Sequence, residues 1–207
     1  MLTRTLTTDD PQALEQALRT LRGGGLVVFP TDTLYGLGCD PTNPAALQAI
    51  YTAKKRPTLK AIPVLIGESS QLRGLVASLP PQAEQLINRY WPGPLTLVLP
   101  RNSKLPTELT PYPGLAVRMP DHSFARMLLR AAGPLAVTSA NISERENPQD
   151  ALEIRAQLEG RVDLILDGGK LSGGTASTII DCTGTGPKLL REGPIAFEEI
   201  QALWAAT

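Results

Sequence analysis

The sequence is poor in the residues from which metal centres, disulfide scaffolds and catalytic triads are built. Its 207 residues include two cysteines, Cys39 and Cys182, and a single histidine, His122. The cysteines lack the C-x-x-C spacing of a zinc or redox site, and nothing supports a disulfide between them. With one histidine and no G-x-S-x-G segment, a hydrolase triad is not expected. We expect His122 to cap a helix or to lie at the surface, and the alternative is a role in a site close to Arg118.

Charge and hydropathy exclude a membrane-spanning protein and a protein that attracts nucleic acid through its overall charge. The 20 basic and 20 acidic residues sum to a net charge of zero. No overall field therefore attracts nucleic acid, and RNA binding would need a local basic patch. The apolar runs fall well short of the roughly 20 residues of a membrane span, and the first residues lack a signal-peptide core. We therefore expect a cytoplasmic protein with no membrane partner.

Apolar residues at helical spacing alternate with short β-rich runs, a pattern typical of an α/β fold. There is no internal repeat and no Gly- or Ser-rich linker that would divide the chain. We predict a single domain over residues 1–207 with a twisted, mixed, open sheet flanked by helices. Helices are expected at residues 11–22, 44–54, 81–90, 123–132, 150–158 and 197–204. Strands are expected at residues 26–29, 62–66, 95–99, 115–119, 135–138, 163–166, 177–181 and 188–190, with a proline-rich loop at 100–113.

The segment after the first expected strand is the most informative part of the chain. Residues 29–38 read F-P-T-D-T-L-Y-G-L-G, so two hydroxyl groups around a carboxylate, and then two glycines, follow an apolar run. Ligands bind at the carboxyl ends of strands in open α/β sheets, and a purely structural turn is the alternative. We expect Asp32 and Asp40 to bond the backbone of their turns, with magnesium coordination as the alternative for both.

Cations and hydroxyl groups follow several other expected elements. Lys54 and Arg56 end the helix at 44–54, so we expect their side chains to lie outside the core. Arginine forks and lysine point charges suit carboxylates and phosphates. Because neither G-x-x-x-x-G-K-[ST] nor G-x-G-x-x-G is present, such a site would act by positioning and charge neutralisation, as in nucleotidyl transfer. The other polar residues at strand ends are Arg118, Ser139, Asn141, Ser177 and Arg191.

Taken in order along the chain, these segments resemble the YrdC-type threonylcarbamoyl-adenylate synthases. The resemblance implies a twisted α/β domain with a positively lined concave face. It also implies an enzyme that converts L-threonine, bicarbonate and ATP into L-threonylcarbamoyl-AMP and pyrophosphate, the first step of threonylcarbamoyladenosine modification of tRNA. The matching segments are P-T-D-T-L-Y-G-L at 30–37, K-K-R-P at 54–57, V-R-M-P at 117–120, S-A-N at 139–141, S-T-I-I-D at 177–181 and R-E-G at 191–193.

The resemblance further implies roles for individual residues. L-threonine is expected at Thr33, Arg118 and Ser177, with Arg118 holding its carboxylate. Apart from the resemblance, we expect Leu34 or Leu65 to face the methyl group of threonine. Lys54 and Arg56 are the expected catalytic cations, which would offset triphosphate charge together with magnesium that arrives with ATP. No protein ligands for a metal are implied. Contact with tRNA and downstream tRNA threonylcarbamoyl-transfer proteins are also expected. The expected ATP-binding residues are Lys54, Arg56, Lys60, Ser139, Asn141, Asn147 and Arg191.

Some features depart from the family pattern. Leu65 stands where many relatives have a histidine that contacts threonine, and residues 142–146 are more charged than usual. The chain ends soon after Arg191, so we expect the short, single-domain form.

Two other interpretations of the function stay open. One is a module that binds tRNA or double-stranded RNA, which the low aromatic content of 4% disfavours. The other is a paralogue with an altered carbamoyl substrate, which the intact motifs at 54–56 and 139–141 disfavour.

Overall fold

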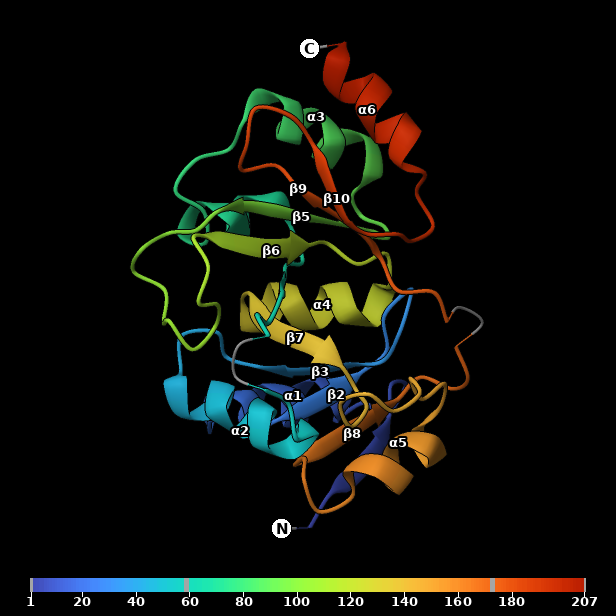
Figure 1. The fold of residues 1–207 in the computed structure, drawn as a ribbon. Coiled ribbons are helices and arrows are strands. Elements are labelled where there is room, and N and C mark those ends of the chain that lie inside the picture. The colour runs from blue at the N-terminus through green and yellow to red at the C-terminus, as the bar shows by residue number, and fades with distance from the viewer. Residues whose placement is uncertain (1, 58–59, 172–173, 207) are drawn as a thin grey trace.

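A ten-stranded mixed sheet forms the centre of the molecule (Figure 1). The computed structural model describes residues 2–57, 60–171 and 174–206. The strand order is β1-β8-β2-β3-β7-β4-β6-β5-β9-β10, with both parallel and antiparallel neighbours, so the sheet is mixed and open. The strands are β1 (Arg4–Thr7), β2 (Val27–Phe29), β3 (Gly36–Cys39), β4 (Val64–Leu65), β5 (Leu95–Pro100), β6 (Gly114–Arg118), β7 (Leu135–Ser139), β8 (Leu164–Asp167), β9 (Thr178–Asp181) and β10 (Lys188–Arg191).

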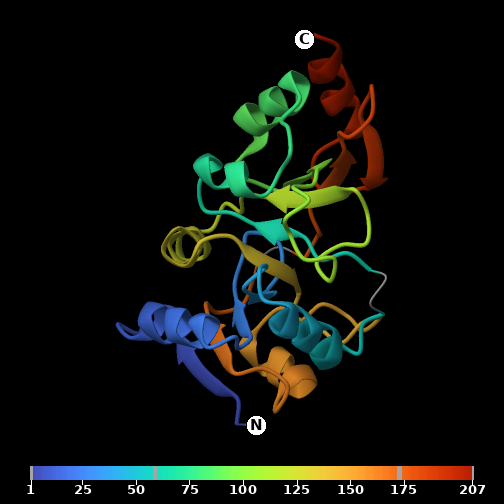
Figure 2. The ribbon, with the colours of Figure 1, turned by 90° about the vertical axis from the view of Figure 1, so that its left-hand side faces the viewer.

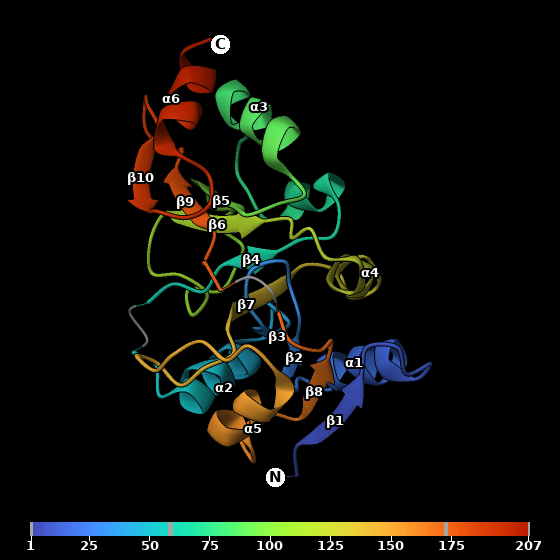
Figure 3. The same cartoon turned by 90° about the vertical axis from the view of Figure 1, so that its right-hand side faces the viewer.

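Helices cover the sheet in three pairs. In Figure 3, α1 and α4 lie on one side of strands β2, β3 and β8, and α2 and α5 lie on the other side. The third pair, α3 and α6, packs together near the C-terminal end of the molecule (Figure 2). The helices are α1 (Ala13–Arg22), α2 (Pro44–Lys54), the 3-10 helix η1 (Ser69–Gly74), α3 (Pro81–Tyr90), α4 (Ser123–Ala132), α5 (Ala151–Leu158) and α6 (Phe197–Ala205).

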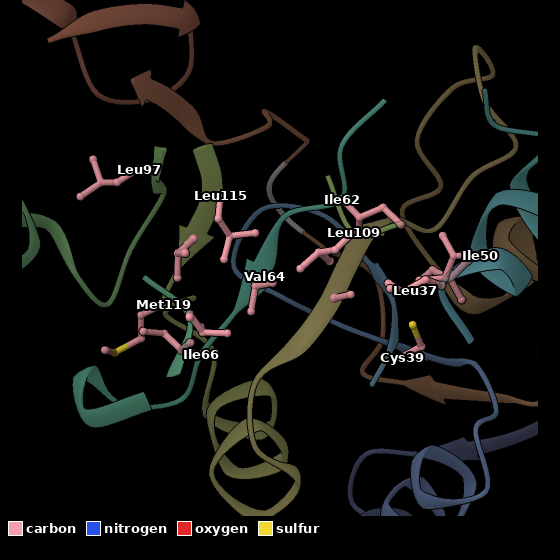
Figure 4. Packing of buried hydrophobic residues seen from close by; sticks show 14 of the residues in the cluster. Leu37, Cys39, Ile50, Ile62, Val64, Ile66, Leu97, Leu109, Leu115 and Met119 are labelled. Atoms are coloured by element: carbon pink, nitrogen blue, oxygen red, sulfur yellow. The ribbon is translucent and has the colours of Figure 1, made fainter. Parts of the chain in front are cut away.

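Side chains of the central strands alternate between two hydrophobic clusters. Val28 packs with Ile50 of α2 in the larger cluster, whereas Val27 and Phe29 pack in the smaller one with α1 and α4. Figure 4 shows part of the larger cluster, in which Leu37 lies beside Ile50 and the line of apolar side chains continues toward β5. Full burial of such a side chain contributes about 1.5–3 kcal/mol to the free energy of folding, so the two clusters hold the helices to the sheet.

Because of this alternation, part of one face of the sheet is left open for a binding site. Leu95, Leu97 and Leu99 of β5 belong to the same cluster as Leu86 of α3 and Ile200 of α6. Thr96, which lies between two of these leucines, therefore points to the opposite face. On that face α4 covers the sheet only as far as Leu65 and Val137 in the middle of the strand order.

The predicted mixed α/β fold is confirmed, and most expected elements are present within one or two residues of their predicted ends. Strands β1 and β3 and helix η1 were not predicted. Strand β3 was missed because two of its four residues, Gly36 and Gly38, are typical of turns. Among the described residues, no helix combines the length and apolar composition needed to cross a membrane. That residues 1–207 form one domain stays a prediction.

Candidate active site

A cavity of about 290 Å³ contains most of the residues predicted to form the site. Its lining carries three arginines, several hydroxyl groups and an apolar floor, and no aspartate or glutamate is among the described residues that line it. Leu34 and Leu65, the expected neighbours of the substrate methyl group, also line it. The predicted ligand-binding residues found here are Thr33, Arg56, Arg118, Ser139, Asn147, Ser177 and Arg191.

Strand register gathers several of these side chains on one face of the sheet. Leu65 of β4 lies opposite Arg118 of β6, and Thr96 of β5 lies opposite Ile179 of β9. Ile179 in turn lies opposite Arg191 of β10. Paired residues on neighbouring strands point to the same face. The cavity therefore lies across the face left free beyond α4, and not only beyond the strand ends as the sequence suggested.

Arg118 is held on three sides at the end of β6. Its Nε donates to the carbonyl of Gly93 at 2.9 Å, and its Nη1 donates to Thr33 Oγ1 at 2.7 Å. Its Nη2 pairs with the Asp32 carboxylate at 2.5 Å. Burial lowers the pKa of the guanidinium and Asp32 raises it. The prediction that Asp32 bonds its own turn backbone is wrong, because its carboxylate is taken up by this buried cation.

The turn that carries Thr33 is shaped by its own hydroxyl groups. Thr31 Oγ1 donates to the carbonyl of Leu34 at 2.6 Å and accepts from the amides of Thr33 and Leu34 at 3.2 Å. Such local bonds are typical of Ser/Thr turns. A side chain on Gly36 would lie 2.6 Å from Val137, so the close approach of β3 to β7 requires glycine there. The turn therefore presents Thr33 to Arg118 in a fixed position.

Ser177 and Arg191, which were assigned to different substrates, are directly bonded. Arg191 donates from Nε to the Ser177 carbonyl at 2.9 Å and from Nη2 to Ser177 Oγ at 3.0 Å. Ser177 Oγ also bonds Thr96 Oγ1 at 2.7 Å. Burial, and then the charge of Arg118, lower the pKa of Arg191, so two cations of the cavity feel one another. A Cβ at Gly193 would lie 2.2 Å from the Thr178 amide, and this close approach requires glycine.

Lys54 and Arg56 point to different places although they are two residues apart. Helix α2 ends at Lys54, and Lys55 adopts the left-handed conformation with φ 51°, a common way for a helix to end. Arg56 lines the cavity and donates from Nη2 to the carbonyl of Ala61 at 2.9 Å. Lys54 is only 1% exposed and does not line the cavity. The expectation that its side chain lies outside the core is therefore wrong.

The Lys54 amine holds the loop that follows β7. It donates to the carbonyl of Ser139, to the carbonyl of Asn141 and to Asn141 Oδ1, the last at 3.1 Å. The Ser143 amide donates back to the carbonyl of Lys54 at 2.9 Å. Burial, and then the nearby Arg56, lower the pKa of Lys54 to about 7. No carboxylate among the described residues pairs with Lys54, Arg56 or Arg191.

The remaining predicted residues do not line the cavity. Asn141 is buried, and its Nδ2 donates to the carbonyl of Arg145 at 2.7 Å, so it builds the loop and does not line the cavity. Lys60 is exposed and lies 3.9 Å from Glu144. His122 caps α4 by accepting from the Ala125 amide, as predicted. Asp40 accepts from the amide and hydroxyl of Thr42, which confirms its predicted turn role.

The side chains that the structure describes do not form a protein-held metal site. Among the described residues, no group of three or more histidine, cysteine, aspartate or glutamate side chains could hold an ion. Cys39 and Cys182 are buried and do not form a disulfide.

A second, larger cavity of about 410 Å³ lies between α1, η1 and the end of α4. It is mostly apolar, and its charged lining residues are Arg22 and Asp40. The smaller cavity thus has the charged groups that a ligand site needs.

Comparison with known proteins identifies the family of this chain. The family model for Sua5, YciO and YrdC, described as telomere recombination, matches residues 19–193. The chain belongs to the Sua5/YciO/YrdC family. It is 41% identical over 208 residues to a threonylcarbamoyl-AMP synthase of Bacillus subtilis, an alignment that covers 98% of this chain and 59% of the relative. The family membership that the sequence motifs indicated is confirmed.

Two solved structures of the family share the fold. The crystal structure of Pyrococcus abyssi Sua5 complexed with L-threonine has a TM-score of 0.90 and 37% identity, and the match covers 98% of this chain and 60% of that one. Escherichia coli YciO has a TM-score of 0.85 and 30% identity, with 96% of this chain and 98% of that one covered. The chain therefore spans about three fifths of the Bacillus and Pyrococcus relatives.

The contributors to the site that were not identified from the sequence include three polar residues with structural roles. Thr96 and Tyr35 line the cavity, and Asp32 supports it from behind. Thr96 could have been found, because it is a polar residue between two leucines of an apolar strand. Tyr35 could not, because its hydroxyl bonds the backbone of Gly168 and Gly169, far along the chain.

Proposed function

We propose that this chain is a threonylcarbamoyl-AMP synthase, which uses L-threonine, bicarbonate and ATP. The observation that carries the proposal is a cavity lined by three arginines and by no carboxylate among the described residues. Two of these arginines have no acidic partner among the described residues, so an anionic ligand would supply the charges that they lack. The name of the Bacillus relative supports the reaction, and the L-threonine complex of the Pyrococcus relative supports threonine as a substrate.

L-threonine would bind at the end of the cavity near β6. Arg118 has N–H groups for a carboxylate, and the hydroxyls of Thr33 and Ser177 lie beside it. Leu34 and Leu65 provide apolar surface for the substrate methyl group. Charge-assisted bonds from a planar guanidinium bind a carboxylate with a defined orientation.

ATP would bind toward Arg56, Ser139 and Asn147, and its triphosphate would extend to Arg191, which is bonded to Ser177. Arg56 and Arg191 would contact the triphosphate. Lys54 would act indirectly, because its amine fixes the backbone of residues 139–141. Its charge has no acidic partner among the described residues. We assign it a positioning role in place of direct phosphate contact. Asn141 would share that role, and Lys60 would contact nucleotide only at the rim.

The reaction would proceed by positioning and charge neutralisation. The threonine amine attacks the carbon of bicarbonate, a C–N bond forms and water leaves, which gives a carbamate. A carbamate oxygen then attacks the α-phosphorus, an O–P bond forms, and the bond to the departing pyrophosphate breaks. Arg56 and Arg191 would stabilise the charge that moves onto pyrophosphate. Bringing the reactants together in one cavity removes the entropy cost of their encounter.

Magnesium is part of this proposal only as a companion of ATP. The cavity offers hydroxyl and amide oxygens but no carboxylate among its described lining residues, so the chain does not fit a resident magnesium ion. Contact with tRNA, transfer of the product by downstream proteins and a cytoplasmic location complete the proposal.

The test is the release of pyrophosphate from ATP in the presence of bicarbonate and each amino acid in turn. We expect release that depends on threonine and on bicarbonate, with threonylcarbamoyl-AMP identified by mass spectrometry. Release that is independent of threonine, or none, would refute the proposal.

A further inference from the structure

The three arginines of the cavity differ in one respect, which is whether a carboxylate neutralises them. Arg118 is paired with Asp32 at 2.5 Å, and both side chains are largely buried. Arg56 donates only to the backbone carbonyls of Lys60 and Ala61, and Arg191 only to Ser177, as far as the described residues show. The cavity therefore contains one cation that a carboxylate neutralises and two cations that have no acidic partner among the described residues.

Asp32 produces this difference without contacting the space that a ligand would occupy. It does not line the cavity, although Thr31, Thr33 and Leu34 around it do. Its carboxylate accepts one N–H of Arg118 Nη2. A substrate would therefore meet Arg118 and not Asp32.

The remaining N–H groups of Arg118 still suit one carboxylate. A guanidinium has five N–H donors. Gly93, Thr33 and Asp32 occupy three of them, so one N–H on each terminal nitrogen has no partner among the described residues. Two N–H groups match the two oxygens of a carboxylate. With its charge already offset by Asp32, this subsite favours a zwitterion or a single carboxylate over a polyanion.

We propose that Asp32 is a specificity-determining residue that keeps polyphosphate out of the Arg118 subsite. This inference rests on the proposed function, in which an amino acid and a triphosphate must occupy adjoining parts of one cavity. A triphosphate bound across Arg118 would exclude the amino acid. Asp32 prevents this by repelling polyanions and by holding the guanidinium in the orientation that a carboxylate needs.

The experiment compares wild-type protein with Asp32→Asn by calorimetric titration with inorganic tripolyphosphate, and with L-threonine in the presence and absence of tripolyphosphate. Asparagine keeps an oxygen that can accept from Arg118 but removes the negative charge. We expect Asp32→Asn to bind tripolyphosphate about tenfold more tightly, the scale on which one uncompensated charge alters anion affinity. We also expect tripolyphosphate to compete with threonine in the variant and not in the wild type.

Two controls separate the local effect from a general change of charge. Asp9→Asn removes the same charge at an exposed position remote in sequence, and its tripolyphosphate affinity should equal that of the wild type. In Asp32→Asn/Arg118→Met both partners of the pair are neutral, which avoids a buried unpaired charge. The tenfold gain should vanish in this double variant, because the gain requires the Arg118 cation.

The outcomes distinguish this inference from the proposed function. If wild-type protein binds no threonine, the proposed function fails, but the tripolyphosphate titrations still decide the role of Asp32. Equal tripolyphosphate affinity in wild type and Asp32→Asn, or a gain that survives removal of Arg118, would overturn the inference.

Discussion

Replacing Lys54 with methionine tests whether this lysine supports the loop after β7 or binds phosphate. Methionine fills a similar volume but cannot donate, so the carbonyls of Ser139 and Asn141 and the Asn141 side-chain oxygen all lose a donor. A buried acceptor left without a donor costs about 1–3 kcal/mol, and removing the buried ammonium offsets part of this. We expect Lys54→Met to lower the free energy of unfolding by about 2–4 kcal/mol.

The assay is urea unfolding together with pyrophosphate release. A support role predicts lower stability and a lower kcat, because Ser139 at the cavity wall moves when its loop loosens. A direct phosphate clamp predicts unchanged stability and a higher KM for ATP. Lys54→Arg is a useful companion, because it keeps the charge but not the shape, and it should not restore stability. Wild-type stability with a raised KM in Lys54→Met would refute the support role.

The loss of stability caused by Lys54→Met should also change with pH in a direction that can be predicted. Burial lowers the pKa of Lys54 from 10.5 to about 7. Between these values the unfolded chain binds more protons than the folded chain, so this lysine's contribution to stability rises with pH. The slope approaches about 1.4 kcal/mol per pH unit. The loss caused by Lys54→Met should therefore be larger at pH 9 than at pH 6, and a difference that shrinks with rising pH would contradict the burial argument.

Three further predictions address the cavity itself. Arg56→Ala should raise the KM for ATP by about tenfold to a hundredfold, the effect of a lost charge-assisted bond, with urea unfolding nearly unchanged; a normal KM would remove Arg56 from the phosphate site. Arg118→Lys should raise the threonine KM at least about tenfold, while ATP binding without threonine, measured by calorimetry, stays the same; the reverse pattern would exchange the two subsites. Serine should be a poor but measurable substrate, since one methyl group against Leu34 and Leu65 is worth about 1–3 kcal/mol; equal kcat/KM for both amino acids would mean that no methyl pocket exists.

The helices could be predicted closely because local chemistry marks their ends. Helix α3 begins at Pro81, a residue favoured in the first turn, and α4 ends before Gly133, whose φ is +91°. Strand β3 is the opposite case. Its Gly36 and Gly38 have no strand propensity, and they form a strand because Val137 and Phe29 fill the space above them. That packing involves residues far apart in the sequence and leaves no local pattern.

The membership of the site could be predicted better than the direction of its side chains. The resemblance to the family placed Thr33, Arg118 and Ser177 in one site, and the cavity contains all three. It could not show that Asp32 turns toward Arg118, because the sequence does not say which strand end faces the turn. Nor could it separate Lys54 from Arg56, since one left-handed residue between them sends the two cations in different directions.

The zero net charge of the chain does not reveal the cluster of cations on which its proposed function depends. Exposed charges more than about 10 Å apart are largely screened from one another at moderate ionic strength, so a ligand in the cavity responds to the groups around it and not to the overall sum. Three arginines from α2, β6 and β10 or their ends face that cavity, and Asp32 offsets one of them from behind. Chain topology, not composition, brings these cations together and leaves two of them without an acidic partner among the described residues. Under the proposed function, this arrangement explains how a neutral protein would bind a polyanion beside a zwitterion.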